Sequence, residues 1–168
     1  GGQKQRVAIT RALAPGTSLI LFDEPFCSLD LHVKLRLRSE LPNILKNSNA
    51  SGIMVTHDPE EAMAICDKVA VMNDGKIHQY EKPSKLISKP KTLFVSSFIL
   101  GNNVLKIKVN KDEIISCIGK FKITKVNQKI NFNYLSISPR SIAITKSING
   151  KGIVISKEFL AEYYIYKI

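Results

Sequence analysis

The sequence predicts an α/β fold over residues 1–100, followed by a small antiparallel β-domain over residues 101–168. In the first segment, apolar strand-like runs alternate with helical runs, which is typical of a sheet covered by helices. After Gly101, short alternating runs separated by turn residues replace that pattern. The charge changes as well: residues 1–98 carry 13 Lys and Arg against 10 Asp and Glu, whereas residues 99–168 carry 12 against 4.

Helix and strand boundaries in the first segment follow from capping and breaking residues. Pro15 and Gly16 stop the first helix, and Asp30 is the expected N-cap of the second, which Pro42 kinks or splits. Asp74 and Gly75 form the turn of a hairpin. In order, we expect a helix over 3–14, a buried strand over 18–23, a helix over 31–46, a buried strand over 53–56, a helix capped by Asp58 that runs from Pro59 to about Cys66, hairpin strands over 68–72 and 76–80, and helices over 83–88 and 92–100.

The second segment reads as short strands whose lysines alternate with apolar residues, as in Lys106–Val109 and Lys120–Ile123. Alternation of this kind indicates half-buried strands with lysine on the solvated side. We prefer that interpretation to a surface for nucleic acid or anionic lipid. The expected strands are 104–109, 113–117, 120–125, 134–138, 142–146 and 152–156.

Composition excludes several classes of protein. No apolar run approaches the roughly 20 residues of a membrane-spanning helix. Arg11 interrupts the apolar stretch that follows Lys4 and Arg6, so these residues do not form a signal peptide. Three cysteines without CxxC spacing indicate reduced thiols in the cytosol, with no zinc site.

Acidic and imidazole side chains stand where two predicted strands end. Asp23 and Glu24 follow the apolar run from Leu19, and His57 follows Ile53–Thr56. Acids at the end of a buried strand are costly unless they meet a metal, a hydrogen bond or water. Strand ends are also where α/β proteins place ligand chemistry. The sequence therefore predicts a ligand site at this edge of the sheet.

Four ordered segments resemble motifs of the ABC ATPase family. Gly1–Val7 (GGQKQRV) resembles the later part of the signature motif, Leu19–Pro25 resembles Walker B, Ser28–Asp30 resembles the D-loop, and Val55–Asp58 carries His57 in the position of the switch histidine. The resemblance covers residues 1–98 and implies the C-terminal part of a P-loop ABC ATPase domain, in an ATP-binding subunit of an ABC importer. The tail at Ser136–Ile142 resembles a segment of the TOBE (OB-like) domain, although Ser and Arg replace residues that are common there.

The resemblance also implies roles for the residues at the strand ends. Asp23 would hold Mg²⁺ through water, and Glu24 would polarise the attacking water as a general base. His57 would hydrogen-bond the γ-phosphate of ATP. Both Glu24 and His57 are thus expected to be catalytic.

Residues near the chain start are expected to reach ATP held by a second subunit. Backbone N–H groups of Gly1 and Gly2, followed by Gln3, precede a helix whose dipole favours an anion there. Asp30 would link the two sites of a homodimer while also capping its helix. The other implied partners are an integral membrane permease and, indirectly, a solute-binding protein. They place the subunit peripherally on the cytoplasmic face of the plasma membrane.

The helix start at Leu31–Leu41 resembles ferric-iron importers, so iron is the first expected solute and a polyamine the alternative.

None of the three Gly-Lys pairs is followed by Ser or Thr, so the 168 residues hold no G-x-x-x-x-G-K-[S/T] lysine loop. We therefore expect a chain truncated at its signature motif and inactive alone, or a non-catalytic remnant.

A third hypothesis is a basic protein that binds single-stranded nucleic acid through the aromatic residues of the tail. Core packing is the simpler account of those residues. They are Phe121, Phe132, Tyr134, Tyr163, Tyr164 and Tyr166.

Overall fold

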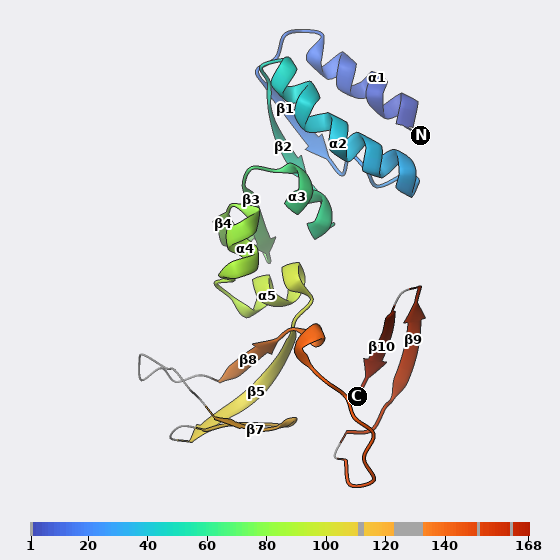
Figure 1. The fold of residues 1–168 in the computed structure, drawn as a ribbon. Coiled ribbons are helices and arrows are strands. Elements are labelled where there is room, and N and C mark those ends of the chain that lie inside the picture. The colour runs from blue at the N-terminus through green and yellow to red at the C-terminus, as the bar shows by residue number, and fades with distance from the viewer. Residues whose placement is uncertain (1, 111–112, 123–132, 151, 162) are drawn as a thin grey trace. The chain divides into compact units, whose positions relative to one another are not determined.

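The computed structural model describes residues 2–110, 113–122, 133–150, 152–161 and 163–168 (Figure 1). The chain divides into two compact units, Gly1–Ile99 and Leu100–Ile168. The first mixes helices with parallel and antiparallel strands, and the described strands of the second are all antiparallel. The predicted α/β class is therefore confirmed.

Every helix and strand predicted for residues 3–100 is present, with small shifts at the ends. Asp30 caps α2 as predicted, and Pro42 lies inside that helix without ending it. The elements are α1 (Gly2–Leu13), β1 (Leu19–Asp23), α2 (Leu31–Asn47), β2 (Ser51–Val55), α3 (Pro59–Ile65), β3 (Val69–Asn73), β4 (Lys76–Glu81), α4 (Pro83–Ser88) and α5 (Leu93–Leu100).

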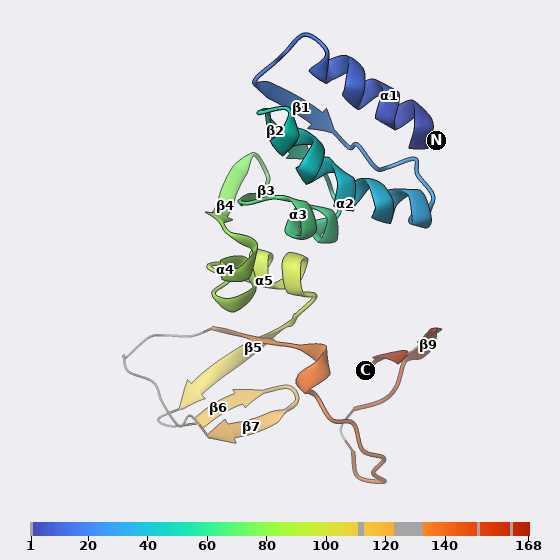
Figure 2. The same ribbon diagram turned by 45° about the horizontal axis from the view of Figure 1, so that its top comes forward.

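Strands β1 and β2 form a parallel pair in which Asp23 lies opposite Val55. Helices α1 and α2 run side by side, and both begin at the end of the pair marked by the β1 arrowhead (Figures 1 and 2). Gly52 permits close packing here, because an added Cβ would lie 3.0 Å from side-chain atoms of both Leu45 and Phe22. The buried core of this region consists of Ile9, Ile20, Phe22, Phe26, Leu37 and Leu41.

The prediction that both parallel strands are buried is wrong for one of their faces. Ile20 and Phe22 are buried, but Leu21 is 72% exposed and Val55 is 59% exposed. Alternate residues of a strand point to opposite faces. Within the part of the chain that the structure describes, α1 and α2 pack on the Ile20–Phe22 face alone. The apolar run therefore has one covered face and one exposed face.

The β3–β4 hairpin packs with α4 and α5 around a second core of Val69, Val71, Leu86 and Val95. Asp74 and Gly75 both have positive φ, 48° and 71°, as the predicted turn requires. Gln79 on β4 is buried, with 4% exposure, and both polar atoms of its side chain are hydrogen-bonded. Its amide nitrogen donates to the Lys89 carbonyl and its oxygen accepts from the Lys91 N–H, which fixes the link between α4 and α5 to the hairpin.

The second unit contains a four-stranded antiparallel sheet in the order β7-β6-β5-β8 and a separate β9–β10 hairpin. The predicted alternation is confirmed on β5, where Ile107 is buried and Lys106 and Lys108 are exposed. The elements are β5 (Asn103–Asn110), β6 (Glu113–Ser116), β7 (Gly119–Lys122), β8 (Tyr134–Ile137), the 3-10 helix η1 (Pro139–Ser141), β9 (Ser156–Leu160) and β10 (Tyr163–Lys167).

Two predicted strands of this unit are wrong. Residues 142–146 are irregular, because Pro139 starts a 3-10 turn that redirects the chain. The strand predicted over 152–156 begins only at Ser156 and pairs with β10, which the sequence interpretation did not include. Residues 123–125 of a further predicted strand, and Phe132, lie outside the described residues.

Leu37→Ala should lower the free energy of unfolding by about 2–5 kcal/mol, because Leu37 is 1% exposed and its truncation leaves a cavity in the α1–α2–β1 core. Leu35→Ala is the matched control on the same helix, where the side chain is 50% exposed. Urea unfolding followed by circular dichroism measures both changes. Equal losses in the two variants would contradict the described packing of α2.

Candidate active site at the ends of the parallel strands

The predicted carboxylate and imidazole meet at the carboxyl end of the β1–β2 pair. His57 Nδ1 lies 2.8 Å from Glu24 Oε1, and the His57 backbone N–H donates to the same oxygen over 3.1 Å. The residues are 33 positions apart in sequence. Parallel pairing places them together, because Asp23 and Val55 are opposite one another and each chain continues from the same edge.

Glu24 has a left-handed backbone, with φ of 46°. A non-glycine residue in this region costs roughly 1–3 kcal/mol, so other contacts must hold it there. The Glu24 N–H donates to the Val55 carbonyl over 2.9 Å, and the carboxylate accepts the two His57 contacts. The turn therefore aims the carboxylate across to β2, a feature that the sequence interpretation did not include.

The Glu24 carboxylate raises the pKa of the His57 imidazole, mainly through their hydrogen bond. The His57 side chain is 80% exposed and that of Glu24 32%. With Nδ1 engaged, the imidazole has Nε2 left to contact a ligand, and Glu24 has its second carboxylate oxygen. The pair can thus combine a proton acceptor with a hydrogen-bond donor on the solvent side of the strand ends.

Asp23 occupies the last position of β1 and is exposed. Among the described residues its carboxylate has no hydrogen-bond or ion-pair partner. No cluster of three or more His, Cys, Asp or Glu side chains forms a metal site in the described ranges. Mg²⁺ is commonly held by one or two carboxylates together with phosphate oxygens and waters, so Asp23 fits one ligand of such a site.

The remaining predicted ligand residues lie at helix starts. Asp30 is exposed, and its Oδ1 accepts the Val33 N–H over 3.0 Å as the N-cap of α2. Gly2 begins α1, Gln3 follows on its first turn and is exposed, and Gly1 lies outside the described residues. No contact in the described structure brings any of these residues to Glu24 or His57.

A charged network supports the turn that carries His57. The Lys34 ammonium on α2 pairs with Asp58 over 2.8 Å and with Glu61 over 2.7 Å. These hydrogen bonds raise the pKa of Lys34, and the one from Lys34 lowers the pKa of Asp58. The sequence interpretation identified Asp58 as a helix cap but did not include Lys34 or Glu61. Their only sequence signal was charge on facing helices, which is common on solvated surfaces.

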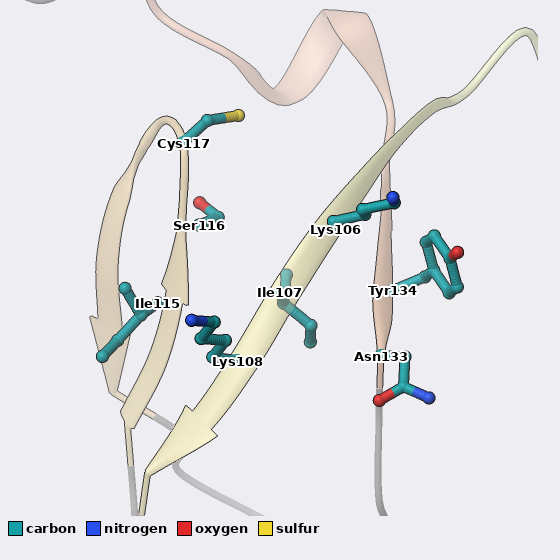
Figure 3. A pocket seen from close by; sticks show the side chains of 8 residues that line it. All are labelled: Lys106, Ile107, Lys108, Ile115, Ser116, Cys117, Asn133 and Tyr134. Atoms are coloured by element: carbon teal, nitrogen blue, oxygen red, sulfur yellow. The ribbon is translucent and has the colours of Figure 1, made fainter.

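A cavity of about 560 Å³ in the second unit contains none of the predicted site residues. Lys106 and Lys108 both line it, but Figure 3 shows Lys106 directed toward the β8 side and Lys108 toward β6. The two ammonium groups therefore do not converge on one anion. The other lining residues are Ile107, Ile115, Ser116, Cys117, Asn133 and Tyr134.

Curated relatives are similar to most of this chain. A spermidine/putrescine import ATP-binding protein of Trichormus variabilis is 44% identical over 128 residues, covering 75% of this chain and 34% of the relative. One from Bacillus thuringiensis is 47% identical over 106 residues, covering 63% and 32%. The similarity is to part of an ABC transporter ATP-binding subunit. The chain spans about a third of the length of the curated relatives it matches.

A solved structure shares the fold of this chain. It is an ABC transporter assigned to the metal-chelate type, in an inward-facing conformation, with a TM-score of 0.51 and 19% identity over 84% of this chain and 48% of that one. No protein-family model matches the chain. None of the helices in the described ranges combines the length and hydrophobicity that a membrane span requires.

Glu24→Gln should return the His57 pKa toward its ordinary value, because the carboxylate is the main cause of the rise. A raised folded-state pKa stabilises the fold below the unfolded-state pKa, and this contribution is lost as pH rises through the folded-state pKa. The variant should therefore lose stability chiefly on the acid side of that window. NMR titration of the imidazole measures the shift, and Asp74→Asn in the hairpin turn is the control. An unchanged His57 pKa in Glu24→Gln would contradict the contact.

Proposed function

We propose that this chain is part of the ATP-hydrolysing subunit of an ABC importer, with Glu24 and His57 at the catalytic site. The observation that carries the proposal is the 2.8 Å contact between Glu24 Oε1 and His57 Nδ1 at the end of the parallel pair. It brings together, from separate motifs, a carboxylate that can take a proton from water and an imidazole that can contact a phosphate oxygen. The sequence similarity to import ATP-binding proteins supports the same function.

Glu24 acts as the general base in this proposal. One of its oxygens is held by His57 and by the His57 backbone N–H, so the other is free to take a proton from water. His57 is fixed through Nδ1, and in the protonated imidazole, which the Glu24 carboxylate favours by raising its pKa, Nε2 can donate to a γ-phosphate oxygen. The exposed position of the imidazole is consistent with a ligand that arrives from solvent.

Asp23 would supply the carboxylate that holds Mg²⁺ through water. When bound, Mg²⁺ neutralises charge that develops on the β- and γ-phosphate oxygens. Because the exposed Asp23 carboxylate would hold the metal, its sequence neighbour Glu24 stays available for proton transfer.

The starts of α1 and α2 are proposed as contacts to a second subunit. Gly1, Gly2 and Gln3 would meet ATP bound by that subunit through N–H groups at the positive end of α1. Asp30 would contact the same partner while it caps α2. With a membrane permease as the other partner, the assembly would lie peripherally on the cytoplasmic face of the plasma membrane.

The second unit is proposed as a TOBE-like regulatory domain beginning near residue 101. Support comes from its antiparallel sheet and from the Ser136–Ile142 segment, which includes the end of β8 and η1. For the solute, we propose a polyamine ahead of ferric iron. The relatives named above are spermidine/putrescine importers, whereas the iron expectation depends on the start of α2 alone.

In a complete ATP-binding subunit that contains this chain, Glu24→Gln should reduce Mg²⁺-dependent ATP hydrolysis by roughly 10²–10⁴-fold, because the base is lost while the shape of the site remains. Phosphate release measures the rate. Glu81→Gln on β4 is the control and should retain full turnover. Full turnover in Glu24→Gln would contradict the base assignment, and a complete subunit without nucleotide affinity would favour the non-catalytic remnant.

In membranes that contain the subunit with its permease and solute-binding protein, spermidine should raise the rate of ATP hydrolysis severalfold and ferric iron should not. Radiolabelled uptake and phosphate release, measured on the same preparation, test this. The Glu24→Gln complex should bind spermidine but not transport it. Iron-dependent stimulation without a spermidine response would restore the iron expectation.

A further inference from the structure

Lys34 connects helix α2 to the turn that carries His57. It lies one helical turn after Asp30, whose carbonyl accepts the Lys34 N–H over 2.9 Å. Its ammonium reaches two carboxylates on the far side of that turn, Asp58 at 2.8 Å and Glu61 at 2.7 Å. One cation thus bridges α2 to both the N-cap and the first turn of α3.

The two carboxylates hold the residues on either side of His57. Glu61 accepts the Thr56 hydroxyl over 2.5 Å, and the same hydroxyl oxygen accepts the Asp58 N–H over 3.1 Å. Asp58 in turn accepts the Glu60 N–H over 2.9 Å as the cap of α3. The backbone of His57 is therefore fixed on both sides, while its side chain makes no described hydrogen bond to the network and is affected by Glu61 and Asp58 only through their charge.

Glu61 makes the network sensitive to its cation. It is 3% exposed, and its described partners are Lys34 and Thr56. A buried carboxylate that loses its cation is strongly destabilised, because its desolvation is no longer offset. Removing the Lys34 charge would also leave Asp58 and Glu61 to repel each other on one turn. Movement of residues 56–58 would relieve both effects, because this turn carries Asp58 and is bonded to Glu61 through the Thr56 hydroxyl.

We propose that Lys34 is a positioning residue for His57, holding the 56–58 turn so that the imidazole faces Glu24. The proposal rests on the proposed function for the meaning of that pair, but not for its geometry. Lys34 touches neither Glu24 nor His57 among its described contacts, so it acts through Asp58 and Glu61 alone.

Arg36 offers a matched control. It lies two residues further along α2 and pairs with Glu40 over 3.0 Å, four positions away on the same helix. Its side chain is 69% exposed, and none of its described contacts reaches the turn. Arg36→Met therefore removes a cation and an ion pair from α2 while leaving the 56–58 turn intact.

The experiment compares the unmodified 168-residue chain with Lys34→Met, Lys34→Arg, Thr56→Val and Arg36→Met by ¹⁵N NMR without nucleotide. Two readouts are used: the His57 Nδ1 resonance, which reports the hydrogen bond to Glu24, and amide exchange at His57 and Asp58. Lys34→Met should move the Nδ1 resonance to that of a solvated imidazole and speed exchange at both amides about tenfold or more. Thr56→Val removes the hydroxyl that links Glu61 to the Asp58 N–H but keeps both ion pairs of Lys34, and it should have the same effect.

Lys34→Arg should restore most of the Nδ1 signature, since it keeps the charge, and Arg36→Met should leave it unchanged. A retained Nδ1 resonance in folded Lys34→Met or Thr56→Val would overturn the proposal, as would an equal change in Arg36→Met. These readouts need no nucleotide, so their failure would leave the ATPase assignment standing. If the complete subunit hydrolysed no ATP although the His57 resonance was normal, that result would count against the ATPase assignment alone.

Discussion

The pairing of β1 with β2 determines what the first unit can do. Its register sets Asp23 opposite Val55, so the residues that leave the two strands emerge at one edge. An acid and an imidazole that are 33 positions apart in sequence then meet within 2.8 Å. An antiparallel arrangement of the same two strands would send Glu24 and His57 to opposite ends of the sheet.

Contacts between the helices maintain this geometry. Arg6 on α1 makes two 2.8 Å contacts to the carboxylate of Glu40 on α2. Both side chains are partly exposed, so this ion pair contributes little to the stability of the fold. The apolar residues shared by α1, α2 and β1 supply the larger part of the stability. Lys34 then transmits the position of α2 to the turn after β2.

Much of the first unit was predictable from the sequence because its helix-ending, helix-capping and turn residues are distinctive. Pro15 and Gly16 end a helix, Asp30 and Asp58 cap two more, and Asp74 with Gly75 forms a hairpin turn. The pairing of Glu24 with His57 was expected from family motifs. Exposure of one face of β1 was not, because an apolar run reads the same whether one face or both are covered.

The second unit was less predictable. Its strands are short, and the lysine alternation on β5 identified faces but not partners. Residues 142–146 have β-branched residues, yet they follow a 3-10 turn and remain irregular. The β9–β10 hairpin joins two runs of five residues that are neighbours in sequence, but no Asn-Gly or Asp-Gly pair stands between them to signal the turn. The Lys34 network was missed because its members are far apart in sequence, at positions 34, 56, 58 and 61.

The backbone of Glu24 separates the requirements of folding from those of chemistry. With φ of 46°, this backbone conformation costs less for glycine or asparagine than for glutamate. A library of variants sorted only for soluble, protease-resistant chains should therefore enrich those two residues at position 24. A library sorted for turnover should keep the carboxylate despite its conformational cost. Opposite enrichment at a single codon would record how far natural selection has accepted a weaker fold in exchange for reactivity.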